Sequence, residues 1–227
     1  GGKQKKKEVI YYAGYHELAY LHPSVFKPEN KILESVGLVE QDRFFIMRFN
    51  VFKAHHDVGV KGLSLEQKLE IIDILKPHGK ILITTERDIE PELSQYQLKV
   101  TPEHVHSLMA YATMFIGDSQ TMTSEAAVLG TPAIRCNSFV GKISYLEDEE
   151  HNYGLTYGFK PENFNKLLLK VEELLANPNL KEIWQEKRLK MLNDKIDVTA
   201  FMVWFIEKYP ESVKILKENP DYQDNFK

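Results

Sequence analysis

One stretch decides the fold of this chain: residues 115–137, with the sequence FIGDSQTMTSEAAVLGTPAIRCN. An apolar run leads into a polar turn at 117–121, an alanine-rich segment follows, and Gly130-Thr131-Pro132 separates it from a second apolar run. This order predicts a strand, a turn, a helix, a glycine stop and another strand, which is the repeating unit of a parallel α/β sheet. We therefore expect an α/β protein with a Rossmann-like parallel sheet sandwiched by helices.

The turn before the predicted helix indicates an anion site. A buried strand at 114–116 would bring residues 117–121 to the carboxyl edge of the sheet, where parallel sheets bind ligands. Asp118 or Ser119 would cap the helix, and the backbone N–H groups of residues 119–122 would point outward with a partial positive charge. A phosphate or diphosphate suits that position. The alternative is that these residues only cap and pack the helix.

The predicted helix has two distinct faces. Met122, Ala126 and Leu129 recur at helical spacing and are expected to face the sheet. Thr121 and Glu125 lie on a neighbouring line, so the Glu125 carboxylate is expected one turn below the anion site. A carboxylate repels phosphate, but it accepts hydrogen bonds from hydroxyl groups such as those of a ribose beside the phosphates.

Three stretches carry a resemblance to a known family, namely GDSQTMTSEAAVLGTPAIR at 117–135, GYHELAYLHP at 14–23 and IEKYP at 206–210. The chain resembles, over nearly its whole length, a bacterial and archaeal family of unknown function. That family is grouped with the GT-B glycosyltransferases and the non-hydrolysing UDP-N-acetylglucosamine 2-epimerases. The resemblance to the epimerases rests on the serine-to-glutamate spacing, the following Leu-Gly-x-Pro and Arg135. Gln120 and Thr121 replace two glycines of the epimerases, which leaves the sugar and the reaction open.

The resemblance implies a nucleotide-sugar site with a diphosphate-binding turn and a ribose-binding glutamate. In the epimerases the loop after the first strand carries a His-Arg pair near the sugar and phosphates, and main chain after a later strand reads the uracil edge. The implied binding residues are Arg48, Val100, Gly117, Asp118, Ser119, Gln120, Thr121, Glu125 and Arg135, of which the two arginines would offset phosphate charge. The candidate catalytic groups are His55, His56 and Glu17.

The histidines of the sequence have three possible roles: contacts in a domain cleft, metal binding and ordinary packing. His16 and His22, in the stretch at 14–23, are further candidates for a domain cleft, with ordinary aromatic packing as the alternative. Adjacent histidines such as those at 55–56 point apart, and no second cluster has matching spacing, so we expect no metal site. His104 and His106 are two residues apart and cannot share a helical face, although one of them can face the cleft.

The remaining patterns divide the chain into elements and domains. We expect further strands at 9–12, 43–49, 80–84, 96–100 and 153–157, and helices at 28–37, 64–75, 161–175, 180–192 and 197–209, with the acidic run at 147–150 in solvent. The domain prediction has three parts. Residues 1–42 are expected to be a linker and the remnant of a missing N-terminal domain. Residues 43–210 are expected to form the Rossmann-like nucleotide-sugar-binding domain, and residues 211–227 a tail.

Composition narrows the class of protein. The chain has 227 residues, of which 43% are hydrophobic and 27% charged, as in ordinary globular proteins. The net charge of −4 argues against a nucleic-acid binder, and no apolar run is long enough for stable membrane insertion. The single cysteine, Cys136, favours a reducing cytoplasm and a small buried side chain.

These observations lead to one main hypothesis and two alternatives. The chain would be the UDP-sugar-binding half of a GT-B-like glycosyltransferase of surface polysaccharide synthesis, with no cofactor and with a catalytic base partly on the missing domain. We therefore expect this chain alone to bind a nucleotide sugar without turnover. The alternatives are an NDP-sugar 2-epimerase-like enzyme, which needs acid and base groups on both faces of the sugar ring, and a non-catalytic Rossmann-like scaffold module.

Overall fold

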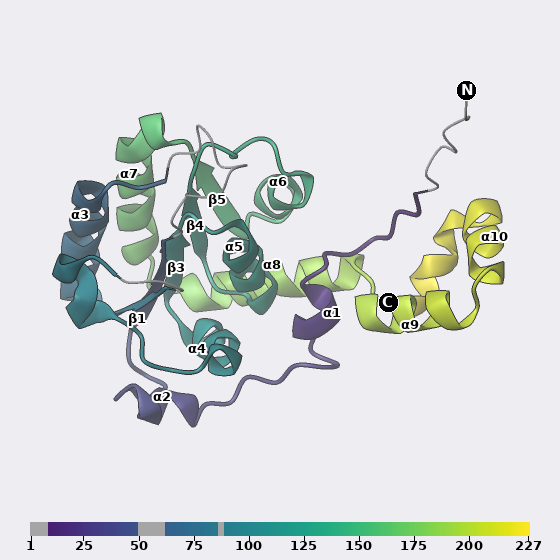
Figure 1. Ribbon diagram of the computed structural model, residues 1–227, viewed down its shortest axis with the longest axis horizontal. Helices are drawn as coiled ribbons and strands as arrows, with labels where there is room; N and C mark the ends of the chain where they lie inside the picture. Colours follow the sequence, from purple (N-terminus) through teal and green to yellow (C-terminus); the bar gives the residue numbers. More distant parts are fainter. Residues whose placement is uncertain (1–8, 50–61, 86–88) are drawn as a thin grey trace. The chain divides into compact units, whose positions relative to one another are not determined.

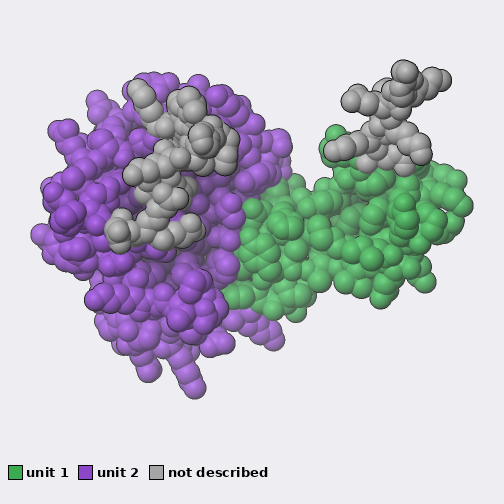
Figure 2. Space-filling model, in the orientation of Figure 1, with its two compact units in different colours: residues 1–26, 191–227 green, residues 27–190 purple. Residues whose placement is uncertain are grey.

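A computed structural model describes residues 9–49, 62–85 and 89–227 (Figure 1). The chain divides into two compact units, one of residues 27–190 and one of residues 1–26 together with 191–227 (Figure 2). The limits of these compact units differ from the predicted domain boundaries, which lie after residues 42 and 210. The division into domains remains a prediction.

The larger unit is built on a five-stranded sheet in which every pair of neighbours is parallel, in the order β2-β1-β3-β4-β5. The strands are β1 (Phe44–Arg48), β2 (Lys80–Thr84), β3 (Met114–Gly117), β4 (Ala133–Cys136) and β5 (Thr156–Phe159). Every residue of β1, β3 and β4 is buried, as expected for parallel strands covered on both faces. The predicted Rossmann-like α/β fold is therefore confirmed.

Helices cover both faces of this sheet (Figure 1). α3 (Leu65–Leu75) and α7 (Phe164–Leu175) pack together on one face, and α5 (Gln120–Leu129) lies on the other between α4 (Val105–Tyr111) and α6 (Ser144–His151). The unit also contains α2 (Ile32–Ser35), most of α8 (Leu180–Asp194), and the short 3₁₀ helices η1 (Lys76–His78), η2 (Pro91–Tyr96), η3 (Pro102–His104) and η4 (Pro161–Asn163).

Local chemistry explains where several of these helices begin and end. The Ser64 side chain accepts the N–H of Gln67 at 3.2 Å, and the Gln67 side chain accepts the N–H of Ser64 at 3.0 Å, which completes the predicted capping box of α3. Gly130 ends α5 in the left-handed conformation, with φ of 77°. This helix start and this helix end depend on contacts within a few residues, which is why the sequence predicted them.

Three predicted strands differ from the structure. Residues 9–12 form no strand, and residues 96–100 meet β2 only through a single bridge between Ile83 and Gln97. This second segment connects two 3₁₀ helices, and it touches the outer strand β2 at one point without forming a sixth strand. The last strand begins at Thr156 rather than 153, because the chain turns through Gly154, whose φ is 62°.

The smaller unit is a helical cluster around aromatic side chains. Its elements are α1 (Leu18–Leu21), α9 (Val198–Glu207), α10 (Glu211–Glu218) and η5 (Pro220–Phe226), so residues 211–227, the predicted tail, are helical. Asp197 caps α9 by accepting the N–H of Ala200 at 3.0 Å. The Phe201 ring packs against the rings of Tyr12, Trp204, Phe205 and Phe226.

Candidate functional site

The start of α5 is built as the sequence predicted. Ser119 is the cap residue, and its hydroxyl accepts the N–H of Met122 at 3.4 Å. The hydroxyl of Thr123 donates to the Ser119 carbonyl at 2.6 Å and ties the first turn together. The first turn of any α-helix carries N–H groups without a partner inside the helix, together with a partial positive charge. This helix start therefore has the polarity of an anion site.

Strand register brings this helix start to the ends of three strands. Arg48 is paired with Thr84 on one side and with Gly117 on the other, so the last residues of β2, β1 and β3 lie side by side. A Cβ on Gly117 would lie 2.2 Å from the Arg48 carbonyl oxygen, so this close approach of two strands requires glycine. The polar turn after β3 therefore opens at the carboxyl edge of the sheet.

A cavity of about 600 Å³ opens at this edge. Its walls come from the ends of β1 and β2, from residues 98–106 and from the first two turns of α5. It is lined by Arg48, Thr84, Thr85, Leu98, Val100, Pro102, Val105, His106, Ser119, Thr121, Met122 and Glu125. Five of the predicted binding residues are brought together here, namely Arg48, Val100, Ser119, Thr121 and Glu125.

The polar side chains of the cavity have defined positions. The Arg48 guanidinium donates from Nη1 to the Thr84 hydroxyl at 3.4 Å, and only 9% of the residue is exposed. The Glu125 carboxylate contacts the His106 imidazole, with 3.0 Å between Oε1 and Nε2. A buried guanidinium thus enters the cavity from the sheet, and a carboxylate held by an imidazole enters it from the helices.

His106 is a site residue that sequence reasoning did not single out. The spacing of the two histidines indicated that only one of them can face the cleft, and the structure shows which. His106 lines the cavity, whereas the ring of His104 lies 2.9 Å from the Thr101 hydroxyl and lines no part of it. The choice depends on how α4 rotates against α5, which the local sequence does not specify.

Three predicted residues lie beside the cavity without lining it. Gly117 allows the close approach of β1 and β3, and Gln120 is half-buried at the first position of α5. Asp118 is 2% exposed; its N–H donates to the Arg48 carbonyl at 3.1 Å, and its own carbonyl accepts from the Asn137 side chain at 2.9 Å. The backbone around the turn is thereby held in place.

Met122, which was predicted to face the sheet with Ala126 and Leu129, is less buried than these two residues. It is half-buried and lines the cavity, whereas residues 123–129 are all buried. Ala126 and Leu129 are buried as expected, and burial extends almost around the helix beyond its first turn, because α4 and α6 cover α5 as well as the sheet. Met122 lies in that first turn, where the cavity opens.

Arg135 also lies away from the cavity. Its side chain is fully buried and forms ion pairs with Glu147 at 2.8 Å and Glu150 at 3.7 Å, both on α6. Glu149 of the same helix is fully buried and accepts from the Ser124 hydroxyl at 2.5 Å. The acidic run was predicted to lie in solvent, but Glu149 is buried against α5, and Glu147 and Glu150 are half-buried beside the Arg135 guanidinium.

The two carboxylates beside Arg135 have pKa values shifted in opposite directions. Burial alone would raise the pKa of Glu147, but the hydrogen bonds from the Gly141 N–H and from Arg135 bring it below its ordinary value. The pKa of Glu150 is raised, because burial outweighs its hydrogen bond from Gly158 and the charge of Arg135.

The other predicted residues are not part of this cavity. Glu17 belongs to the smaller unit, where it is 6% exposed and precedes α1. In the same unit the His22 ring lies 3.7 Å from the Asp197 carboxylate, and the His16 ring meets Tyr20 edge-on. The candidates at 55–56 lie outside the described residues. The part of the chain that is described contains no group of three residues able to hold a metal ion.

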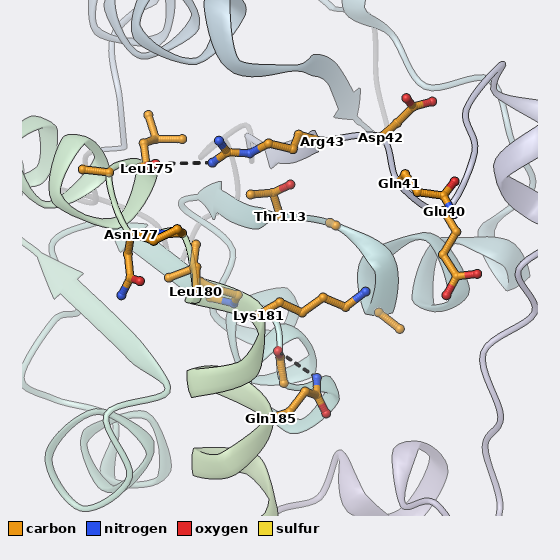
Figure 3. A pocket seen from close by; sticks show the side chains of 16 residues that line it. Glu40, Gln41, Asp42, Arg43, Thr113, Leu175, Asn177, Leu180, Lys181 and Gln185 are labelled. Carbon is orange, nitrogen blue, oxygen red and sulfur yellow. Dashed lines mark hydrogen bonds between the residues drawn. The ribbon is translucent and has the colours of Figure 1, made fainter.

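A second cavity, of about 460 Å³, lies at the opposite edge of the sheet, where Arg43 and Thr113 precede β1 and β3. Figure 3 shows the Arg43 guanidinium directed at the Leu175 carbonyl, 3.5 Å away, and the Gln185 amide donates to the Gly130 carbonyl at 3.2 Å. These carbonyls lie at the ends of α7 and α5, where helices lack internal donors. Arg43 and Gln185 thus cap the protein's own helices, and we take the first cavity, at the carboxyl edge of the sheet, as the candidate site.

Comparison with solved structures identifies the class of fold. The chain is similar to CalG4, the calicheamicin glycosyltransferase, with 14% identity and a TM-score of 0.50, over 75% of this chain and 44% of that one. It is similar to the glycosyltransferase SnogD from Streptomyces nogalater with 12% identity and a TM-score of 0.50, over 85% and 55%. The fold thus matches that of GT-B glycosyltransferases, and the chain spans about half the length of the structures it matches.

The chain is also similar to a UDP-N-acetylglucosamine 2-epimerase, with 15% identity and a TM-score of 0.49, over 81% of this chain and 47% of that one. No curated protein matches the sequence at a significant level. The chain belongs to the family described as protein of unknown function (DUF354), whose model matches residues 2–200. In the described ranges, none of the helices has the length and apolar character to cross a membrane.

Proposed function

We propose that the cavity at the start of α5 binds the nucleoside diphosphate part of a nucleotide sugar. The chain would then be the donor-binding half of a GT-B-like glycosyltransferase, acting in surface polysaccharide synthesis. One observation carries this proposal: a capped helix start, a buried arginine and a carboxylate held by an imidazole line a single cavity at the carboxyl edge of the sheet.

Each part of a nucleoside diphosphate has a counterpart in this cavity. The diphosphate suits the N–H groups at the start of α5, with the Arg48 guanidinium offsetting its charge. The Glu125 carboxylate, one helical turn further on, accepts hydrogen bonds from the pentose hydroxyls. The apolar side chains Leu98, Val100 and Val105 offer a wall for the base. A volume of about 600 Å³ is in the range of small-molecule sites.

The same arrangement supports transfer chemistry. When a glycosyl group leaves its donor, negative charge develops on the departing nucleoside diphosphate. Fixed N–H dipoles and an arginine stabilise that charge without reorganisation, which lowers the barrier. This chain supplies these groups for the leaving part of the donor, while the acceptor and the base that activates it would be bound by the rest of a larger enzyme.

Isothermal titration calorimetry with UDP and UDP-N-acetylglucosamine tests the proposal. We expect heat of binding from both ligands, because they share the nucleoside diphosphate, and a loss of at least about tenfold in affinity for Glu125→Gln. Glu40→Gln is a matched control, since it removes a carboxylate from the opposite cavity and should leave the affinity unchanged. Absence of binding by any nucleoside diphosphate at millimolar concentration would refute the proposal.

A further inference from the structure

The pairing of His106 with Glu125 is a contact between two helices that meet at the cavity. His106 lies in the first turn of α4 and Glu125 in the second turn of α5, and these helices pack together. Nε2 of the imidazole lies 3.0 Å from Oε1 of the carboxylate. The imidazole therefore restricts where the carboxylate can be.

The helix that carries His106 is itself held on both sides. The Ser107 hydroxyl accepts the N–H of Glu29 at 3.2 Å, and the Thr131 hydroxyl donates to the Met109 carbonyl at 2.6 Å. Residues 107–109 are all buried. Because α4 is fixed to the chain before it and to the turn after α5, the His106 ring has a defined position at the cavity wall.

The pair is open to the cavity, which separates it from an ion pair that only packs helices together. The side chains of His106 and Glu125 remain 28% and 10% exposed, and both line the cavity. The Glu125 carboxylate is thus mostly withdrawn from water but still accessible from the side on which a ligand would lie. A hydroxyl group that reaches it exchanges few water contacts for a charge-assisted hydrogen bond.

We propose that His106 is a positioning residue that fixes the Glu125 carboxylate for the pentose diol, and that the pair makes the cavity select ribonucleoside over 2′-deoxyribonucleoside diphosphates. This inference rests on the proposed function. A carboxylate held in one orientation accepts the 2′-hydroxyl without first losing rotamer freedom. A ligand without that hydroxyl leaves part of the partly buried carboxylate without a partner, and the affinity falls.

The experiment compares UDP with 2′-deoxy-UDP by calorimetry in the unchanged protein and in three variants. For the unchanged protein we expect UDP to bind about tenfold or more tightly than 2′-deoxy-UDP, since a hydrogen bond to a charged group is lost. His106→Leu should reduce this ratio to about twofold or less, mainly by weakening UDP. His106→Gln, whose amide can still donate to Glu125, should restore part of the ratio.

His104→Leu is the matched control, because it removes a neighbouring imidazole that lines no part of the cavity. It should leave the ratio unchanged. Thermal unfolding of every variant shows whether it is folded; if the leucine variant at 106 is not, His106→Asn, with a side chain too short to reach Glu125, takes its place in the comparison.

The possible results separate the two proposals. An unchanged ratio in the leucine or asparagine variant, equal weakening of both ligands, or equal binding of both by the unchanged protein would overturn the role of the pair while leaving nucleotide binding intact. Absence of binding of both nucleotides to the unchanged protein would refute the proposed function, and this inference with it.

Discussion

Replacing Gly117 by alanine tests the strand contact on which the candidate site is built. The new Cβ would lie 2.2 Å from the Arg48 carbonyl oxygen and 3.1 Å from both its carbon and nitrogen. All three are backbone atoms, so no side chain can turn away to relieve the overlap. Ordinary contact begins near 3.4 Å, so β1 and β3 would have to separate by about 1.2 Å at this point.

The cost follows from this separation. Overpacking a dense interior costs about 1–3 kcal/mol, and loss of the hydrogen bond from the Asp118 N–H to the Arg48 carbonyl adds about 1 kcal/mol. We expect Gly117→Ala to lower the free energy of unfolding of the larger unit by about 2–4 kcal/mol, the sum of these two costs. Arg48 and Ser119 flank the contact, so the cavity would be distorted as well.

The two tryptophans allow the larger unit to be followed separately. Trp184 is 2% exposed in the larger unit, whereas Trp204 lies in the smaller one, so a Trp204→Phe background leaves Trp184 fluorescence as a single reporter. Urea unfolding should show a lower midpoint with an unchanged slope.

Gly141→Ala is the control for this substitution. Its φ of 85° strains an alanine, but nothing lies within 4 Å of the added Cβ, so we expect a loss of only about 1 kcal/mol. A loss for Gly117→Ala that is below about 0.5 kcal/mol, or no larger than that of the control, would refute the reasoning.

Three further predictions concern a cap, an ion pair and the cysteine. Ser64→Ala should lower the free energy of unfolding by about 1 kcal/mol, because the N–H of Gln67 loses its acceptor; an unchanged urea midpoint would contradict the cap. The pKa of Glu147 is lowered in the folded state, so this carboxylate stabilises the fold above its unfolded-state pKa, and that contribution is lost as pH falls through the lowered value. Glu147→Gln should therefore weaken the fall in urea midpoint between about pH 6 and about pH 3, and an identical pH profile would count against the pair with Arg135. Burial, aided by the charges of Asp118 and Glu162, raises the pKa of Cys136 to about 12, so a thiol reagent at pH 8 should label it only as the larger unit unfolds. Rapid labelling of the native protein would show that this strand is accessible.

Some of the fold and five of the twelve residues that line the candidate site could be predicted from the sequence, because several of the deciding interactions are local. Ser119 caps α5 through a bond to the third residue after it, and Gly130 ends the helix by its own conformational freedom. Apolar runs without alternation indicated parallel strands covered on both faces, and the strands at 80–84 and 114–116 were found where expected. A helix start that follows such a strand must lie at the ligand-binding edge.

Long-range packing decided the remainder. The direction of the Arg135 side chain depends on α6, which pairs two carboxylates with it. Met122 is half-buried because a cavity formed by several elements opens beside it. The segment at 96–100 has a strand-like sequence but pairs with the sheet through one bridge only, which the local sequence does not reveal.

The sequence by itself determined the parallel α/β class, the capped helix start and the spacing from Ser119 to Glu125, since each depends on residues within a few positions of one another. Only the tertiary structure decided that His106 rather than His104 meets Glu125, and that Arg48 rather than Arg135 lines the cavity. These choices depend on how helices rotate against each other and which strands are neighbours, and such contacts join residues that are distant along the chain.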